Sequence, residues 1–456
     1  MLFRFFAALI LIATSPCLEP VLAAEGPTDK PAYFLKSGRE FTYHTEATSK
    51  NGAGRQYIVD WKVWPVGRES DGSWRLVIRC DLTMKDATTP RPTEKETKDT
   101  LVWRCRMFND GRLIGATTMG TVRDPFRLFP RLPDGAKELE AGWDSAGPEQ
   151  EGVTQHHRLT PGTKPGDETI SITTVSEGPQ DKVYLSHHSM LATFDKKRGA
   201  VTRVETEDRS EHLNRGSSTK GIIELTSIEE RGDEWAAKFG KEAEFYFDAV
   251  DAYEEAQRMA GRDAGRCAGL LADAKVGLEK TLKALTTTVF VDSIGSKIAA
   301  HDGFAKYLAR EASERAERID KVAEGWEAKG VDGKAHRLED YRGKVVVMDF
   351  WYRNCGWCIS AMPQVVQLSK SFHDQPVAVL GMCTDEKESD ARAVIDAMGM
   401  TYPTIKAKGI AEKYGINGFP TLLVLDKRGI IREIHVGYSP RLFEDVSGII
   451  RKLLAE

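Results

Sequence analysis

The stretch of sequence that decides the fold reads VVVMDFWYRNCGWC and covers residues 345–358. Its first half is an apolar run that contains Asp349, as expected for a buried strand. Cys355 and Cys358 follow at the start of a predicted helix over Cys358–Phe372. Two cysteines at this spacing can close a small disulfide ring, and the unpaired N–H groups and positive dipole end of the helix favour the thiolate of the first one. Because a thiolate is the species that attacks disulfides, the stretch predicts a redox-active pair.

The same Cys-x-x-Cys spacing also occurs as one half of a zinc site. No second Cys-x-x-Cys or Cys-x-x-His follows at a usable distance along the chain. The two adjacent-histidine pairs, at 156–157 and 187–188, would point to opposite faces of a strand, so one ion could not easily use both members of a pair. We therefore expect neither a metal nor an organic cofactor.

The sequence around this stretch alternates between strand and helix patterns. The predicted elements are strand Val345–Phe350, helix Cys358–Phe372, strand Val377–Met382, helix Ser389–Gly399, strands Thr421–Leu425 and Ile430–Val436, and helix Arg441–Leu454. This order predicts an α/β domain at 329–456, in which a mixed sheet is covered by helices on both faces.

Several features of residues 329–456 stand at characteristic spacings. They are LEDYRGK at 338–344, Asp349 six residues before Cys355, Pro363 eight residues after it, YGINGFPT at 414–421, and Gly437. With these features the region resembles the thioredoxin superfamily, and more closely its exported TlpA/ResA-like branch. The usual motif of that branch is Cys-x-Pro-Cys, whereas this chain has Trp357 in place of the proline. The aromatic residue leaves the preferred direction of the redox reaction open.

The resemblance implies roles for the residues that carry chemistry. Cys355 would be the nucleophile, and Cys358 would resolve the mixed disulfide. Asp349 would lie buried beneath Cys358 with a raised pKa, which would let it exchange a proton near neutral pH. The alternative for Asp349 is a polar core residue whose hydrogen bonds are satisfied.

The resemblance also implies a surface that binds substrate. Pro420 would follow a cis peptide bond, and the Phe419 backbone would lie beside the sulfurs, where an extended substrate could pair with it. Trp351 would form part of the wall of the site, although plain core packing is the alternative. Trp357, next to the second cysteine, completes the expected substrate-binding set.

Two further residues lie close to this site in the predicted topology. Cys383 lies just past the predicted strand Val377–Met382, and a right-handed crossover would bring it to the sheet edge that carries the redox pair. It could act there as a third thiol, but a small buried side chain is the simpler interpretation. Arg353 could add positive potential near Cys355, and a solvated surface charge is again the simpler interpretation.

The rest of the chain lacks a recognisable catalytic motif. Alternating segments separated by turn signals predict an antiparallel β-rich domain at 28–232, and Ala-, Glu-, Lys- and Leu-rich helical patterns predict a helical spacer at 233–328. The expected fold class is therefore multidomain α+β, with a C-terminal thioredoxin fold. Cys80 and Cys105 fall on neighbouring predicted strands, where they either pair in a disulfide or remain reduced and buried.

Residues 1–24 read as a signal peptide, because Arg4 precedes the apolar run Phe5–Ala13 and small residues end at Ala24. We therefore expect export to the periplasm or cell envelope. The formal net charge of −4 gives no reason to expect nucleic acid as a partner. The expected activity is reduction of disulfides in cell-envelope proteins by dithiol–disulfide exchange, for which the resemblance implies a membrane electron donor. A disulfide oxidase or isomerase, or a scaffold with an accessory redox domain, is the alternative, and the sequence leaves the oligomeric state open.

Overall fold

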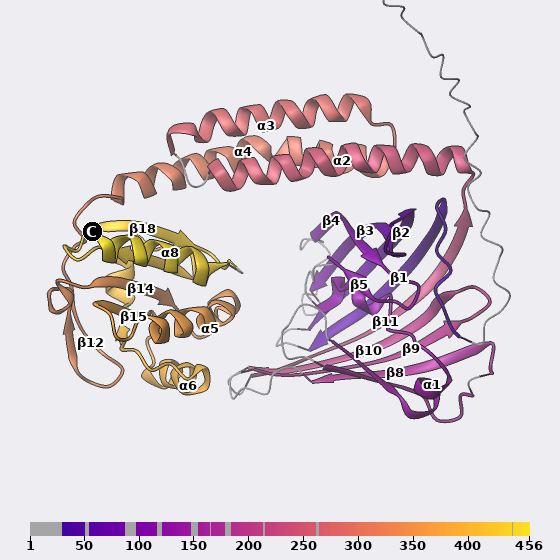
Figure 1. Cartoon of the computed structure of the whole chain (residues 1–456), viewed down its shortest axis with the longest axis horizontal. Coiled ribbons are helices and arrows are strands. Elements are labelled where there is room, and N and C mark those ends of the chain that lie inside the picture. The colour runs from indigo at the N-terminus through magenta and orange to yellow at the C-terminus, as the bar shows by residue number, and fades with distance from the viewer. Residues whose placement is uncertain are drawn as a thin grey trace, which may run out of the picture.

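A computed structural model describes residues 30–50, 54–86, 97–115, 121–146, 154–164, 166–177, 184–212, 215–260, 264–439 and 441–456. The expected signal peptide at 1–24 lies outside the described residues. Within them, the chain has an N-terminal antiparallel β-rich part, a layer of long helices and a C-terminal thioredoxin-like domain (Figure 1).

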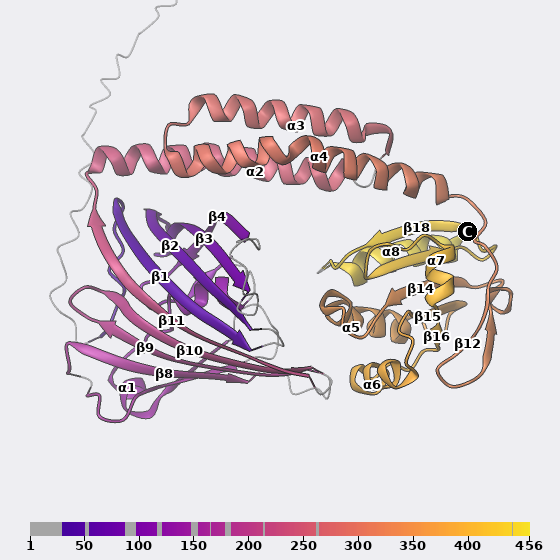
Figure 2. The same ribbon diagram turned by 180° about the vertical axis from the view of Figure 1, so that it is seen from behind.

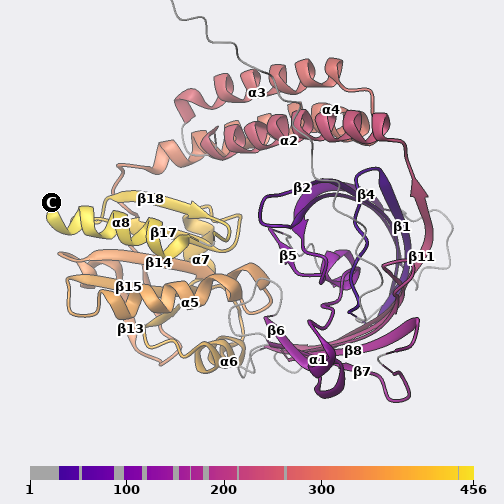
Figure 3. The same ribbon diagram turned by 45° about the vertical axis from the view of Figure 1, so that its right-hand side comes forward.

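The β-rich part is one antiparallel sheet of eleven strands among the described residues. The strands are β1 (Arg39–Lys50), β2 (Arg55–Arg68), β3 (Trp74–Asp86), β4 (Thr97–Met107), β5 (Leu113–Ile114), β6 (Trp143–Ala146), β7 (Thr154–Leu159), β8 (Thr169–Glu177), β9 (Tyr184–Asp195), β10 (Ala200–His212) and β11 (Arg215–Glu230). Their order in the sheet is β5-β4-β3-β2-β1-β11-β10-β9-β8-β7-β6. The sheet curls strongly, and Figure 3 looks into its concave side.

The concave face is filled by side chains from the strands and by the chain segment between β5 and β6. This segment holds the short 3₁₀ turns Thr121–Arg123 and Pro125–Arg127 and helix α1 (Ala136–Ala141). Its Leu128 and Phe129 join Trp61 and Phe194 of the strands in one apolar core. The core accounts for the alternating pattern of the strands, since every second side chain points into it.

Cys80 and Cys105 lie in this core and form no disulfide. Cys105 stands opposite Leu76 on β3, whereas Cys80 stands opposite Leu101. The offset of four residues separates the two thiols by about 13 Å along the strand, too far for a disulfide. Of the two alternatives that the sequence left open, the structure therefore has reduced and buried thiols.

The helical layer consists of α2 (Asp233–Ala260), α3 (Ala264–Ala284) and α4 (Thr288–Arg318). It runs above the sheet at one end and above the thioredoxin-like domain at the other (Figure 2). Trp64 and Val77, on the outer face of the sheet, pack against Phe239 of α2 and Phe290 of α4. This apolar contact fixes the helical layer on the sheet.

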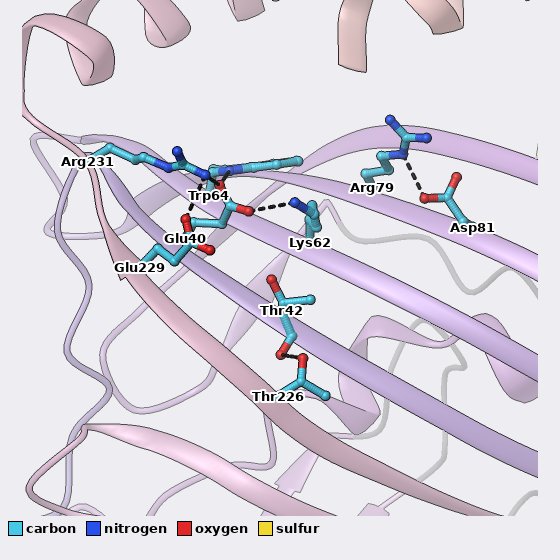
Figure 4. Close-up of polar contacts among 9 residues, drawn as sticks. All are labelled: Glu40, Thr42, Lys62, Trp64, Arg79, Asp81, Thr226, Glu229 and Arg231. Carbon is cyan, nitrogen blue, oxygen red and sulfur yellow. Dashed lines mark hydrogen bonds and ion pairs between the residues drawn. The ribbon is translucent and has the colours of Figure 1, made fainter. Parts of the chain in front are cut away.

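A buried carboxylate supports the sheet beneath these helices. Glu40 of β1 accepts hydrogen bonds from Lys62 Nζ at 2.8 Å, Trp64 Nε1 at 3.0 Å and Arg231 Nη2 at 3.1 Å (Figure 4). Burial by itself would raise the pKa of Glu40, but the hydrogen bonds from Lys62, Trp64 and Arg231 outweigh it, and the net pKa is lowered. The ionised carboxylate thus ties β1 and β2 to the residue that follows β11.

The thioredoxin-like domain has a five-stranded sheet in the order β16-β15-β14-β17-β18. Its elements are β14 (Val345–Trp351), α5 (Gly356–Ser371), β15 (Val377–Cys383), α6 (Glu388–Met398), β16 (Thr404–Lys406), α7 (Lys408–Lys413), β17 (Thr421–Leu425), β18 (Ile431–Val436) and α8 (Leu442–Ala455), preceded by the hairpin β12 (Glu327–Lys329) and β13 (Ala335–Arg337) and a 3₁₀ turn at Leu338–Tyr341. β15 is parallel to β14, and β17 is antiparallel to it. The sheet is therefore mixed, as the sequence predicts, and the short β16 and α7 are additions that the sequence did not reveal.

Helices and loops cover both faces of this sheet, so the central strands β14 and β17 are buried along their whole length. Helices α5, α6 and α8 pack on one face, with Val365, Val394 and Val446 in the same core as Val347. Helix α7 and the segment just after α4 cover the other face, where Ile410 and Trp326 meet the strands. The redox motif lies where β14 ends and α5 begins, at the edge between these two layers.

Candidate functional site

The redox pair occupies the head of helix α5. Cys355 is the N-cap residue, and its sulfur accepts a hydrogen bond from the Cys358 N–H at 3.1 Å. The two sulfurs form a disulfide that spans the first turn of the helix. The N–H groups of this turn have no partner within the helix, so they and the dipole stabilise negative charge on Cys355 once the bond is reduced. This is the arrangement expected from the sequence.

Trp357, next to Cys358, is a large apolar side chain that is 65% exposed. Its ring stacks on Tyr438, with ring centroids 5.6 Å apart. Both cysteines are buried, whereas Trp357 and Tyr438 form an exposed aromatic pair next to them. Tyr438 was missed in the sequence, because it stands 81 positions after Trp357.

The loop before β17 approaches the redox pair from the other side. The Phe419–Pro420 peptide bond is cis, which confirms the expectation from the sequence. The Phe419 ring meets Tyr352 edge to face at 5.2 Å, and the Pro420 carbonyl accepts from the Gly437 N–H at 2.8 Å. These contacts hold the loop beside the segment that leads into the Cys-x-x-Cys motif.

Asp349 lies at the centre of β14 and is 1% exposed. Burial raises its pKa from the ordinary 3.8 to about 7. In the part of the chain that the structure describes, its Oδ1 atom has no hydrogen-bond partner, so it is not a satisfied core residue. A carboxyl group in this state can take or give a proton near neutral pH.

Other polar atoms lie buried around Asp349 on the same sheet. Asp349, Gly381 and Thr404 stand side by side across β14, β15 and β16. A β-carbon at Gly381 would lie 2.9 Å from Thr404 Oγ1 and 3.1 Å from Trp351 Nε1, and the Tyr402 pKa is raised by burial and by the charge of Asp349. Tyr402 and Thr404 escape detection in the sequence, because only the short strand β16 brings them to this row.

Trp351 is fully buried, in the core shared with α5 and α8. It therefore presents no surface to a substrate, and core packing is the role that the structure gives it. Its position beside Cys383 on β15 follows from the parallel pairing of the two strands.

Cys383 reaches the same sheet edge as the redox pair, as the crossover rule predicts. It is buried, and its thiol donates to Asp385 Oδ2 at 3.4 Å. Burial raises the pKa of this thiol, with charges on Asp385 and Asp390 adding to the effect. A protonated, hydrogen-bonded thiol is a poor nucleophile, so the structure favours the simpler interpretation of Cys383.

Arg353 is not the solvated surface charge that the sequence suggested. Its side chain is largely buried and pairs with Asp390 of α6, while its backbone N–H donates to Asp385 Oδ2 at 2.6 Å. The sequence could not show this pairing, because α6 meets the redox loop only in the folded domain. Arg353 therefore ties the loop before Cys355 to α6.

In the part of the chain that the structure describes, no group of three or more His, Cys, Asp and Glu side chains is placed to hold a metal ion. His157 hydrogen-bonds Ser145 and Thr174, and burial lowers its pKa to about 4. A Cys-x-x-Cys disulfide at the head of a helix, a buried carboxyl group on the preceding strand and a cis-proline loop beside the motif suit thiol–disulfide exchange. The fold and site thus define the class of the protein as a thiol–disulfide oxidoreductase.

Comparisons with known proteins agree with this class. Residues 319–434 match the AhpC/TSA family. The chain is 31% identical over 143 residues to the thioredoxin-like protein YneN of Bacillus subtilis (strain 168), covering 31% of this chain and 84% of that protein. It is 27% identical over 137 residues to the thiol-disulfide oxidoreductase ResA of Geobacillus thermodenitrificans (strain NG80-2), covering 30% of this chain and 79% of that protein. The chain belongs to the thioredoxin-like family that includes these relatives.

One solved structure among those that match is the thioredoxin domain of a thiol-disulfide oxidoreductase from Bacteroides vulgatus. It is 26% identical, covers 29% of this chain and 97% of that chain, and has a TM-score of 0.27. The family match begins at residue 319, so the curved sheet and the whole of the helical layer α2–α4 lie outside it.

Proposed function

We propose that this protein is exported and reduces disulfide bonds of cell-envelope proteins. The carrying observation is the Cys355–Cys358 pair at the head of α5, together with the buried carboxyl of Asp349 on β14, the strand that leads into it. Export is supported by the signal-peptide pattern at 1–24. In the described part of the chain, no helix combines the length and apolarity needed to cross a membrane.

The reaction transfers two electrons to the substrate. The Cys355 thiolate attacks one sulfur of the substrate disulfide, that bond breaks, and the released substrate sulfur takes up a proton. Cys358 gives its proton to the Asp349 carboxylate and attacks the Cys355 sulfur. The mixed disulfide breaks, the second substrate sulfur leaves as a thiolate and takes up a proton, and the enzyme holds the Cys355–Cys358 disulfide. A thiol donor must then restore the dithiol, and we propose a membrane electron donor for this step.

Trapping of the mixed disulfide tests the order of attack. Cys358→Ser leaves Cys355 without the cysteine that resolves the mixed disulfide. The variant should therefore accumulate covalent complexes with disulfide-containing proteins, and a reductant should cleave these complexes. Cys355→Ser is the matched control and should trap far less. Equal trapping by both variants would contradict the assigned roles, while partners that survive reduction would favour a scaffold.

The reduction potential decides between reductase and oxidase. A Cys355–Cys358 reduction potential of about −270 mV favours reduction of substrates, whereas a value of about −120 mV favours their oxidation. Equilibration of the full chain with glutathione or dithiothreitol buffers, followed by thiol alkylation, gives this value. A potential at the oxidising end would replace the proposed direction with that of a disulfide oxidase.

A further inference from the structure

A groove of about 830 Å³ lies between the helical layer and the edge of the thioredoxin-like sheet. We call it the α4–β18 groove. One wall is the last part of α4, including Tyr307, Leu308 and Glu311, and the other is the end of β18 with the loop after it, including Val436 and Tyr438. The groove also touches Gly418, one residue before the Phe419–Pro420 bond. It therefore begins at the cis-proline loop and leads away along α4.

The groove contains an open strand edge, because β18 is the last strand of its sheet. Val436 stands opposite Thr421, and the Gly437 N–H bonds the Pro420 carbonyl, so the backbone groups of Val436 point away from β17. The same holds two residues earlier, at Ile434. Both residues line the groove, so their backbone groups are available to an added strand.

The chain itself covers only the first part of this edge. The Asp320 N–H donates to the Ile431 carbonyl at 2.9 Å, and the Ile431 N–H donates to the Lys321 carbonyl at 2.9 Å. Within the described residues, this segment makes no backbone bond to Ile434 or Val436. The edge thus has the geometry for strand addition where it faces the groove.

Apolar side chains connect the groove to the redox pair. Tyr438 lines the groove and stacks on Trp357, which is next to Cys358. Tyr307, on the opposite wall, is 48% exposed, and Val436 is also exposed. Large exposed apolar groups that gather at one opening indicate a surface that binds a partner. Here they form one surface that continues the mouth of the redox site.

The α4 wall is held firmly against the redox domain. Arg315 of α4 forms an ion pair with Glu433 of β18, and Arg318 Nη1 donates to the Tyr414 carbonyl at 2.9 Å. The last turns of α4 therefore keep their distance from β18, and the groove is formed before any partner arrives. Figures 1 and 2 show α4 ending directly beside this domain.

We propose that the α4–β18 groove binds an extended segment of the disulfide-bearing polypeptide, which adds as a strand beside β18 and contacts Tyr307 of α4. This inference rests on the proposed function and assigns its substrate class. A strand added beside β18 would lie three strand spacings, roughly 14 Å, from β14, a distance that about four extended residues span. The segment in the groove is thus about four to six residues from the substrate cysteine. Such a groove favours locally unfolded polypeptides over compact proteins or small disulfides.

Photo-crosslinking from a trapped peptide tests the placement directly. Full-length Cys358→Ser protein is joined through Cys355 to a ten-residue peptide that has one cysteine and a benzophenone side chain four residues before or after it. We expect crosslinks to α4 around Tyr307 from at least one of the two peptides. Crosslinks confined to residues 329–456 in both cases would overturn the groove assignment. Failure to form any mixed disulfide would instead refute the proposed function.

Substrate kinetics provide the second test, with a closely matched control. Tyr307→Ala removes an exposed ring on α4 that lies 5.8 Å from the Arg310 guanidinium. Phe245→Ala removes an exposed ring on α2 that lies 5.8 Å from the Lys241 ammonium but does not line the groove. We expect Tyr307→Ala to raise KM about tenfold for an unfolded polypeptide that retains one disulfide while its other cysteines are carboxymethylated, which corresponds to the loss of one good anchor.

The comparison with a small disulfide separates docking from chemistry. Turnover of oxidised glutathione should be the same in both variants and in the unmodified protein, since this substrate does not reach Tyr307. An unchanged polypeptide KM in Tyr307→Ala, or an equal loss with both substrates, would overturn the proposal. Loss of the polypeptide preference in Phe245→Ala would do the same.

Discussion

The raised pKa of Asp349 should affect both the stability of the folded protein and its catalysis. The pKa is about 7 in the folded, oxidised protein, against an ordinary 3.8. Because the pKa of Asp349 is higher in the folded state than in the unfolded state, its protonated carboxyl contributes its full stability below about pH 4. That contribution is lost as the pH rises through about 7. At roughly 1.4 kcal/mol per pKa unit, ionisation of buried Asp349 costs about 4 kcal/mol above neutral pH.

The substitution Asp349→Asn removes this cost, since the amide carries no charge. Relative to the unmodified protein, the variant should gain about 1 kcal/mol at pH 4.5 and about 4 kcal/mol at pH 8.5 in the free energy of unfolding. Hydrogen exchange of the β14 amides, compared between the two proteins at each pH, measures this difference for the domain that contains the residue. Exchange in the variant should be slower by a factor that grows roughly two hundredfold between the two pH values.

The same variant should lose activity, because Cys358 no longer has its proton acceptor. The resolving step should slow by about a hundredfold, as is common when a general base is removed. Asp374→Asn is the control, since the Asp374 side chain is 84% exposed in the same domain. A difference in stability between Asp349→Asn and the unmodified protein that stays constant with pH would refute the reasoning about the buried carboxyl.

Three further predictions concern the N-terminal sheet and the thiol of Cys383. Arg127 donates two hydrogen bonds of 2.7 Å to Asp208, so Asp208→Asn should destabilise β9 and β10 by about 3 kcal/mol at pH 7. This loss should shrink in acid, because the pKa of Asp208 is lowered in the folded protein and the stability that the ionised group contributes disappears as the pH falls. Hydrogen exchange of the β9 and β10 amides measures both effects. Glu40→Gln should cost about 2 kcal/mol, since three donors then face a neutral amide, and exchange at β1 measures the loss. In the reduced, folded protein, Cys383 should react with iodoacetamide far more slowly than Cys355 at pH 7.5, and mass spectrometry that finds equal labelling would contradict the buried, hydrogen-bonded thiol.

Much of the redox domain was predictable, because its signals are local. The apolar run Val345–Phe350 is by itself typical of a buried strand. The Cys-x-x-Cys pair is recognised as a helix-head motif from the helical pattern that directly follows it. The cis bond before Pro420 follows from one short motif. The alternation along the N-terminal strands likewise predicts a packed antiparallel sheet, since one face must be buried.

The amino-acid sequence by itself thus identified the Cys355–Cys358 pair and most of the longer strands and helices of the redox domain, because both depend on spacing along the chain. Only the tertiary structure decided the rest. Strand register separated Cys80 from Cys105, the docking of α6 gave Arg353 its partner, and the position of α4 placed Tyr307 across from Val436. These outcomes depend on how distant segments pack in three dimensions, and pairings between residues that lie tens to hundreds of positions apart leave no periodic trace in one sequence.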